Sequence, residues 1–165
     1  MTDIENRKRG YTWSDPSVTA AGAAGRTGLE FLRAIASGEL PAAPIAETLG
    51  FTVGAVEEGK VTFVLDAAEF HYNPIGSVHG GVYATLLDSA AACAVHSMLP
   101  AGVGYTSLDL NVKFLRRWTA DTGPASCTGT VVHLGSRTAL ARAELKDAGG
   151  KLLAEATSSC LILRG

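Results

Sequence analysis

The segment from Val82 to Met98 limits what this chain can fold into more than any other part of the sequence. It is apolar and rich in alanine, and Asp88 is its only carboxylate. This composition predicts a helix, from about Gly80 to Met98, that neighbouring elements cover on most of its faces. Leu99-Pro100 ends the helix, because a residue before proline disfavours helical backbone angles. Small side chains along the helix would let a sheet approach it closely.

Asp88 is the residue of this helix that most needs an explanation. A carboxylate buried among apolar side chains costs free energy unless it is hydrogen-bonded. Its helix face is typical of close packing, since that face also carries Gly81, Ala84, Ala91 and Ala92. A solvent-exposed carboxylate without a function is the alternative, and this face does not favour it. We therefore interpret Asp88 as a candidate general base or nucleophile.

The helix is preceded by the run His79-Gly80-Gly81. Backbone N–H groups in the first turn of a helix have no acceptor within the helix. They point toward open space and can hold a negative charge there. The sequence thus combines an anion-binding helix end with a carboxylate two turns later, and this combination predicts chemistry rather than core packing alone.

The chain before residue 50 is expected to be helical or irregular. Residues 1–25 show no periodicity and are predicted to form a flexible tail, whereas residues 26–165 are predicted to form a single domain. Within that domain, residues 26–49 read as a helical extension. Thr27 and Glu30 form a capping box, and Gly38 ends the helix that they begin. Pro44 to Leu49 would add a short helical turn.

Strand patterns occupy most of the remaining sequence. From Tyr105 the pattern alternates, with Leu108, Leu110, Val112 and Phe114 on one side of a predicted strand. The other predicted strands, of which the first two form a hairpin, are Phe51–Val56, Lys60–Asp66, Ala125–Leu134, Thr138–Lys146 and Leu152–Leu163. The fold class is therefore α+β, with an antiparallel β-sheet wrapped around one long central α-helix.

Composition excludes several classes of function. The net charge of −2 offers no broad field for nucleic acid, and no stretch is apolar enough to cross a membrane. The three cysteines and four histidines lack the spacing of a zinc site or a disulfide framework, so we expect no metal and a reducing, cytoplasmic setting. Cys93 reads as a small core residue, and Tyr11, Trp13 and Trp118 as residues that fill or edge the core.

A family resemblance rests on a set of short motifs. They are Asn73, Gly76, His79-Gly80-Gly81, Thr85-Leu86-Leu87-Asp88 and Ser107-Leu108-Asp109-Leu110-Asn111. Together they resemble the hotdog-fold acyl-CoA thioesterases of the phenylacetate-pathway (PaaI-like) type, over about residues 40–165. The resemblance implies a hotdog fold and the hydrolysis of acyl-CoA thioesters. It also implies no cofactor besides the coenzyme A of the substrate, and a homodimer that is often paired into a homotetramer.

The resemblance also implies roles for single residues. Asp88 would activate the attacking water or attack the thioester itself. The N–H group of Gly80 would hold the thioester oxygen as it becomes negative, and Asn73 would assist. His79 would orient the loop, and Ser107 would place the water. Three of these residues also have a structural alternative. Asn73 could simply form a turn, His79 could cap the loop, and Ser107 could make an ordinary hydrogen bond.

Coenzyme A carries phosphates, which favour cations and backbone N–H groups. Arg116 and Arg117 end a predicted strand, and Gly135-Ser136-Arg137 forms a predicted turn. We expect these residues, with Gly81, to bind substrate or coenzyme A. Solvated charges at strand ends are the alternative for the arginines.

The spacing of Gly80 and Asp88 has a consequence for assembly. The eight residues between them correspond to roughly 12 Å along one helix. A reacting carbon must lie about 3 Å from both groups. Two copies of the chain are therefore required, with Gly80 of one copy opposite Asp88 of the other in a twofold dimer. A monomer is expected to be inactive.

Two other functions stay open at this stage. One is a hotdog hydratase or dehydratase of enoyl or hydroxyacyl thioesters, and the other is a non-catalytic acyl-CoA-binding protein. The acyl preference is also open. Its pocket wall is expected to include Tyr83, Leu86, Leu87 and the loop 70–72, and the helical extension is expected to dock on the sheet edge or over the pocket mouth.

Overall fold

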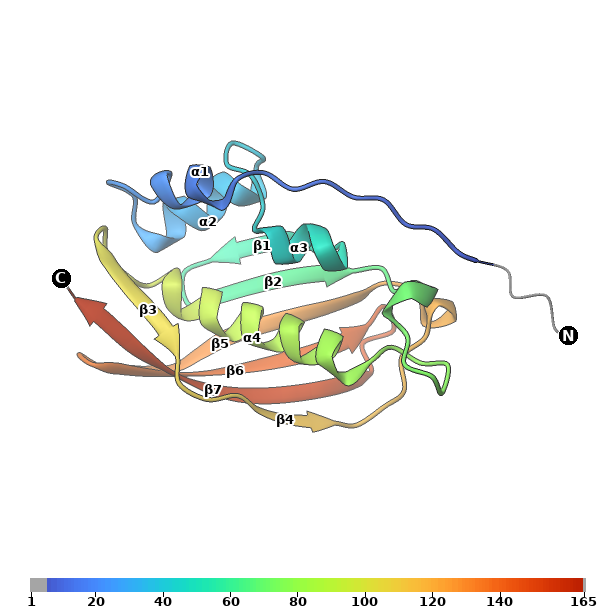
Figure 1. The fold of residues 1–165 in the computed structure, drawn as a ribbon. Coiled ribbons are helices and arrows are strands. Elements are labelled where there is room, and N and C mark those ends of the chain that lie inside the picture. The colour runs from blue at the N-terminus through green and yellow to red at the C-terminus, as the bar shows by residue number, and fades with distance from the viewer. Residues whose placement is uncertain (1–5, 165) are drawn as a thin grey trace, which may run out of the picture.

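A seven-stranded antiparallel sheet curves around one long helix in the computed structural model, which describes residues 6–164 (Figure 1). The strand order is β1-β2-β5-β6-β7-β3, and β4 also pairs with β7. The strands are β1 (Thr52–Glu57), β2 (Lys60–Leu65), β3 (Val103–Ser107), β4 (Asn111–Phe114), β5 (Ala125–Leu134), β6 (Thr138–Asp147) and β7 (Leu152–Arg164). The predicted α+β class, with the sheet wrapped around a central helix, is confirmed.

The central helix α4 (Gly80–His96) lies against the concave face of the sheet (Figure 1). Ala90, Ala91 and Ala94 are fully buried in this contact. The backbones come so close that a Cβ atom built on Gly129 of β5 would lie 2.0 Å from the carbonyl oxygen of Ala90. Alanine on the helix and glycine on the strand are therefore what permits this packing, and the expectation of a helix covered by a close sheet is confirmed.

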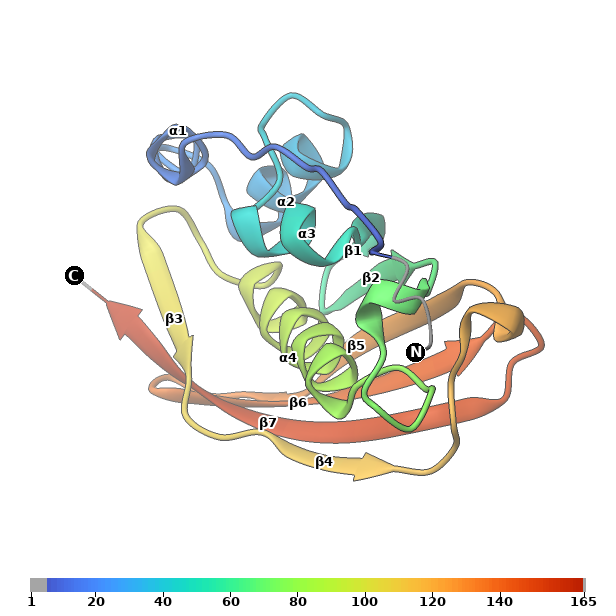
Figure 2. The same ribbon diagram turned by 45° about the vertical axis from the view of Figure 1, so that its right-hand side comes forward.

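Three short helices precede the sheet. They are α1 (Pro16–Ala21), α2 (Gly28–Ala36) and α3 (Pro44–Leu49). The predicted capping box of α2 is present: the Glu30 N–H donates to Thr27 Oγ1 at 3.3 Å, and the Thr27 N–H donates to Glu30 Oε2 at 2.8 Å. α2 runs beside β1 and α4, with α4 between the short helices and the sheet (Figure 2).

α1 lies in the segment where the sequence showed no periodicity. Asp15 caps it by accepting a hydrogen bond from the Ser17 N–H at 2.9 Å. The helix has only six residues, which is too short for an apolar period to emerge. The first five residues of the predicted tail lie outside the described residues.

The single strand predicted from Tyr105 onward is wrong. The structure has β3 and β4 on the same side of β7, separated at residues 108–110. Asp109 interrupts the ladder, because its Oδ1 accepts from the Ser159 N–H and its carbonyl oxygen accepts from the Ser158 hydroxyl. The predicted apolar side of this strand is not uniformly buried, since Leu108 and Phe114 are each 57% exposed.

The aromatic residues divide between core and surface. Trp118 is fully buried, and its Nε1–H donates to the carbonyl oxygen of Gly123 at 3.2 Å. Tyr11 and Trp13 are exposed and do not pack against the core, so the expectation that they fill or edge it is wrong for these two residues. They lie in the extended segment before α1, where the rings pack on each other with centroids 5.9 Å apart.

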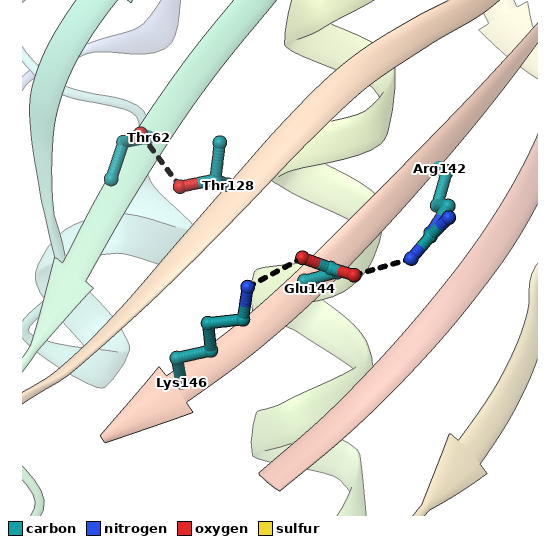
Figure 3. Close-up of polar contacts among 5 residues, drawn as sticks. All are labelled: Thr62, Thr128, Arg142, Glu144 and Lys146. Atoms are coloured by element: carbon teal, nitrogen blue, oxygen red, sulfur yellow. Dashed lines mark hydrogen bonds and ion pairs between the residues drawn. The ribbon is translucent and has the colours of Figure 1, made fainter. Parts of the chain in front are cut away.

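The outer face of the sheet carries polar contacts on β2, β5 and β6 (Figure 3). On β6 the Glu144 carboxylate lies between Arg142 and Lys146 and is ion-paired with both. The hydrogen bond from Lys146 is the largest cause that holds the pKa of Glu144 below its usual value. Thr62 and Thr128 hydrogen-bond across β2 and β5 at 2.9 Å. The buried residues of β6, among them Ala141, Ala143 and Leu145, alternate with its polar residues along the strand.

The contact at Gly129 predicts a large effect of a small substitution. Gly129→Ala would force a methyl group into the α4 backbone, and overpacking of this kind costs about 1–3 kcal/mol or more of the free energy of unfolding. Gly104→Ala in β3 is the matched control, because the nearest atom to its new Cβ would be a Leu163 carbon at 3.8 Å. It should change stability by only about 0.5 kcal/mol. Urea unfolding of both variants measures the difference, and equal stabilities would contradict this account of the packing.

Candidate active site

Asp88 lies in the middle of α4 and Ser107 at the end of β3. The Ser107 hydroxyl donates a hydrogen bond to Asp88 Oδ1 at 3.0 Å. Both residues line a cavity of about 360 Å³ whose other walls are mostly apolar. The structure thus brings together two of the predicted site residues and leaves Asp88 Oδ2 available to a ligand.

The start of α4 has one backbone donor without an acceptor. His79 is the N-cap residue: its Nδ1 accepts from the Gly81 N–H at 2.8 Å, and its carbonyl oxygen accepts from the Val82 N–H at 2.9 Å. The Gly80 N–H has no hydrogen-bond partner among residues 6–164. Gly80 therefore carries the donor that can hold a ligand, whereas the predicted ligand contact of Gly81 stays a prediction because its N–H is used by His79.

His71 supports this helix end, a role that the sequence did not indicate. The side chain is buried, its Nδ1 accepts from the Ala68 N–H at 3.0 Å, and its Nε2 lies 2.6 Å from the Leu49 carbonyl oxygen. This pattern fits the neutral tautomer with the proton on Nε2. The His71 carbonyl oxygen accepts from the His79 N–H at 2.8 Å. The loop before α4 is thereby tied to α3, a contact that no local pattern predicts.

Asn73 shapes the turn before α4. Its Oδ1 accepts from the Ile75 N–H at 3.0 Å, and its Nδ2 lies 3.4 Å from the Ser77 hydroxyl. Its backbone N–H also donates to the Ser77 carbonyl oxygen at 2.8 Å. The side-chain oxygen is therefore used inside the turn, and the predicted contact of Asn73 with a thioester stays a prediction.

The arginines predicted to bind coenzyme A lie near Gly80. Arg116 and Arg117 line a second cavity, of about 510 Å³, together with Gly80, Tyr83 and Phe114. Each guanidinium group also donates to a backbone carbonyl, Arg116 to that of Leu152 at 2.8 Å and Arg117 to that of Gly76 at 2.7 Å. Both arginines thus fix the loops around this cavity while their charge stays exposed.

The turn Gly135-Ser136-Arg137 lies far from these arginines within one chain. The backbone carbonyl oxygen of Arg137 accepts a hydrogen bond from the Ile162 N–H. The backbone N–H of Arg116 donates to the Leu153 carbonyl oxygen. The nine residues from 153 to 162 on β7 correspond to roughly 30 Å. One ligand could contact both segments only if they came from different chains.

Gly80 and Asp88 line different cavities of the same chain. Tyr83 belongs to the Gly80 cavity, and the loop 70–72 lines a third cavity beside His79. Leu86 and Leu87 are fully buried against the core and do not line the cavity of Asp88, so the expectation that they form its wall is wrong.

The cavity of Asp88 continues to Cys93 and Tyr105. Burial raises the pKa of the Cys93 thiol to about 12 and the pKa of the Tyr105 hydroxyl well above its usual value. Burial lowers the pKa of His96, whose ring lies 5.1 Å from that of Tyr105. These groups are therefore neutral near pH 7, and Cys93 is not a thiolate nucleophile.

Residues 6–164 contain neither a cluster of metal-ligating side chains nor a membrane-spanning helix. No group of three or more histidine, cysteine, aspartate or glutamate side chains there could hold a metal ion. No helix within the same residues is long and apolar enough to cross a membrane.

The raised thiol pKa values predict slow alkylation. At pH 8 a thiol with a pKa of about 12 is ionised roughly a thousandfold less than a free cysteine, and burial also raises the pKa of Cys127 and Cys160. Native protein should therefore react slowly with iodoacetamide at all three cysteines, and denatured protein should react fully. Mass spectrometry of the labelled peptides measures this. Rapid labelling of Cys93 in native protein would restore it as a candidate nucleophile.

Comparison with known proteins gives consistent matches. Residues 75–154 match the family Thioesterase superfamily. The chain is 30% identical to 1,4-dihydroxy-2-naphthoyl-CoA hydrolase of Listeria monocytogenes over 66% of this chain and 87% of that protein. It is 31% identical to human acyl-coenzyme A thioesterase 13 over 63% of this chain and 74% of that protein.

A solved structure agrees with the sequence matches. A phenylacetic acid degradation-related protein from Ralstonia eutropha superposes with a TM-score of 0.71 at 31% identity, over 79% of this chain and 98% of that one. The chain therefore belongs to the thioesterase superfamily, as a hotdog-fold member of the PaaI-like type.

Proposed function

We propose that this protein hydrolyses acyl-CoA thioesters to a free acid and coenzyme A. The observation that carries the proposal is the hydrogen bond from Ser107 to Asp88 at the mouth of an apolar cavity. The relatives from Listeria and human are named as a hydrolase of a CoA thioester and an acyl-CoA thioesterase, and these names agree with the proposal.

In the proposed reaction Asp88 acts as a general base. Its Oδ2 takes a proton from a water molecule as the water oxygen bonds to the thioester carbon. Ser107 holds Oδ1 by its hydroxyl hydrogen and so orients the carboxylate, while its own oxygen can accept a hydrogen bond from the water. The tetrahedral intermediate then breaks its carbon–sulfur bond, and the coenzyme A thiolate leaves and is protonated. Direct attack by Asp88, with a transient anhydride, uses the same geometry.

Gly80 of a second chain would supply the oxyanion donor. Its N–H is the free donor at the start of α4, where the helix dipole also favours negative charge. The two groups line separate cavities in one chain, so a shared site needs a dimer. The open β3–β4 edge of the sheet, with Leu108 and Phe114 exposed, supports an interface at this edge.

Coenzyme A would lie toward the arginines. Arg116 and Arg117 share a cavity with Gly80, so a thioester held by that N–H has two guanidinium groups nearby for its phosphates. The turn Gly135-Ser136-Arg137 could reach the same coenzyme A only from another chain. A homotetramer would supply that second contact, and we propose this assembly as an extension of the dimer.

The alternatives fit the site less well. Hotdog hydratases pair a histidine with an acid, but no histidine lines the cavity that holds Asp88 and Ser107. A binding protein without catalysis has no need of the carboxylate oriented by Ser107. Turnover of enoyl-CoA would favour the first alternative, and binding without turnover of any acyl-CoA the second.

The base assignment predicts the effect of Asp88→Asn. Loss of a general base lowers turnover by on the order of a hundredfold or more. The variant should keep its fold, because asparagine still accepts the hydrogen bond from Ser107. Asp121→Asn, at an exposed carboxylate in the short 3-10 helix Ala120–Thr122, is the matched control and should keep full activity. Thiol release from acetyl, hexanoyl, lauroyl, benzoyl and phenylacetyl-CoA measures both, and full activity of Asp88→Asn would refute the assignment.

The shared site predicts complementation between two inactive variants. Gly80→Val would set a Cβ atom 3.3 Å from the Phe114 ring and its methyl groups around the oxyanion donor, so this variant should be inactive like Asp88→Asn. After refolding an equal mixture, half of the dimers are mixed, and each mixed dimer has one intact site. Activity should therefore return to about a quarter of the wild-type value. If the mixture stays inactive while native mass spectrometry shows mixed dimers, Gly80 and Asp88 do not act across the interface.

A further inference from the structure

We propose that the two helices α2 and α3 form one wall of the acyl pocket and set the size of acyl group that the enzyme accepts. This inference rests on the proposed thioester hydrolysis. It concerns residues that precede position 75, where the match to the thioesterase superfamily begins.

The cavity beside Asp88 is closed on one side by the helical extension. α2 contributes Leu32 and Ile35, and the loop and helix that follow contribute Ala42, Ala43 and Ala46. Figure 2 shows α2 and α3 above α4, with β1 and β3 on either side. A third of the residues that line this cavity thus come from the extension.

The same cavity contains Asp88, the proposed base. Asp88, Ser89, Ala92 and Cys93 line it from successive turns of α4, so it extends from Asp88 toward the helix C-terminus by roughly 7 Å. A thioester carbon at Asp88 would direct its acyl group along this path. Tyr105 lines the far part of the cavity from β3.

The side chains that line the cavity determine which acyl groups can bind there. Asp88 is the only charged side chain among the lining residues, and no cation is present to neutralise a second carboxylate. The Tyr105 hydroxyl is neutral, because burial raises its pKa well above the usual value. The remaining surface is largely aliphatic and aromatic, with Phe51 and Phe63 at the β1–β2 side. The pocket therefore suits an uncharged acyl group.

The volume of the cavity limits the length of the acyl group. A cavity of about 360 Å³ lies at the small end of ligand pockets, which span about 300–1,000 Å³. A compact aromatic or medium-length aliphatic acyl group fits this space, whereas a long fatty acyl chain does not.

α2 is held firmly enough to act as a wall. The Gly28 N–H donates to the Leu99 carbonyl oxygen at 3.0 Å, and a Cβ atom on Gly28 would lie 1.7 Å from the His96 carbonyl oxygen. The Phe31 and His96 rings also pack with centroids 5.4 Å apart. The start of α2 is therefore fixed on the end of α4, and its side chains keep a constant distance from the cavity.

Ile35 is the position that tests the wall. It lines the cavity and is only half-buried, so a larger side chain can enter the cavity without disrupting the core. Ile35→Trp should shorten the pocket, and Ile35→Ala should lengthen it. Ala36→Trp adds the same side chain at the neighbouring exposed position of α2, outside the cavity, and is the matched control.

The experiment measures kcat/KM of wild type and the three variants for acyl-CoAs from acetyl to lauroyl, with phenylacetyl-CoA. Ile35→Trp should lower kcat/KM for the longest good substrate by about tenfold or more while acetyl-CoA changes little, since one methylene in an apolar pocket is worth about 10–200-fold. Ile35→Ala should move the optimum to longer chains. Ala36→Trp should keep the wild-type profile.

A binding measurement separates this inference from the proposed function. Calorimetry with S-hexyl-CoA and S-dodecyl-CoA, thioethers that cannot be hydrolysed, reports the pocket without turnover. If wild type hydrolyses acyl-CoAs but the Ile35 variants keep its chain-length profile, the inference that α2 and α3 limit the acyl pocket is wrong, and the proposed function stands. If no acyl-CoA is hydrolysed, the proposed function fails. In that case, weaker binding of S-dodecyl-CoA than of S-hexyl-CoA by Ile35→Trp, relative to wild type, would support the pocket wall. Unchanged binding of both thioethers would contradict it.

Discussion

The close approach of α4 to β5 is the contact on which the rest of this structure depends. It is possible because Gly129 has no side chain and because Ala90 and Ala91 face it from the helix. This contact fixes α4 against the sheet, and Asp88 then lines the cavity that β1, β2 and β3 also line. The carboxylate is thus placed at a cavity by the packing of the helix, and Ser107 then fixes its orientation.

A single rigid helix also limits what one chain can do. It offers a free N–H at its first residue and a carboxylate two turns later, and these groups open into different cavities. A straight helix cannot bring them to one carbon atom. Under the proposed function, assembly is therefore part of the chemistry, because only a second copy turned by a twofold axis supplies the missing donor.

The sequence predicted the elements that depend on local pattern, and it predicted less where distant contacts decide. The helix α4, the capping box of Thr27 and the β-hairpins follow from spacing and turn residues, and the structure confirms them. The break between β3 and β4 was missed because the Asp109 side chain bonds to Ser159, fifty residues away. The role of His71 was missed for the same reason, since its partners are Leu49 and the backbone of His79.

Under the proposed function, the helical extension is the part of the chain that would set the acyl selectivity. The residues that would bind and activate a thioester lie on α4, on β3 and in the loop before α4, all within or close to the part of the chain that matches the family. The wall formed by α2 and α3 lies outside that part, and Gly28 anchors it to the end of α4. Substitutions in α2 can therefore change the volume beside Asp88 without moving the carboxylate. A constant reaction centre and a variable wall would let the acyl preference change while the chemistry is retained.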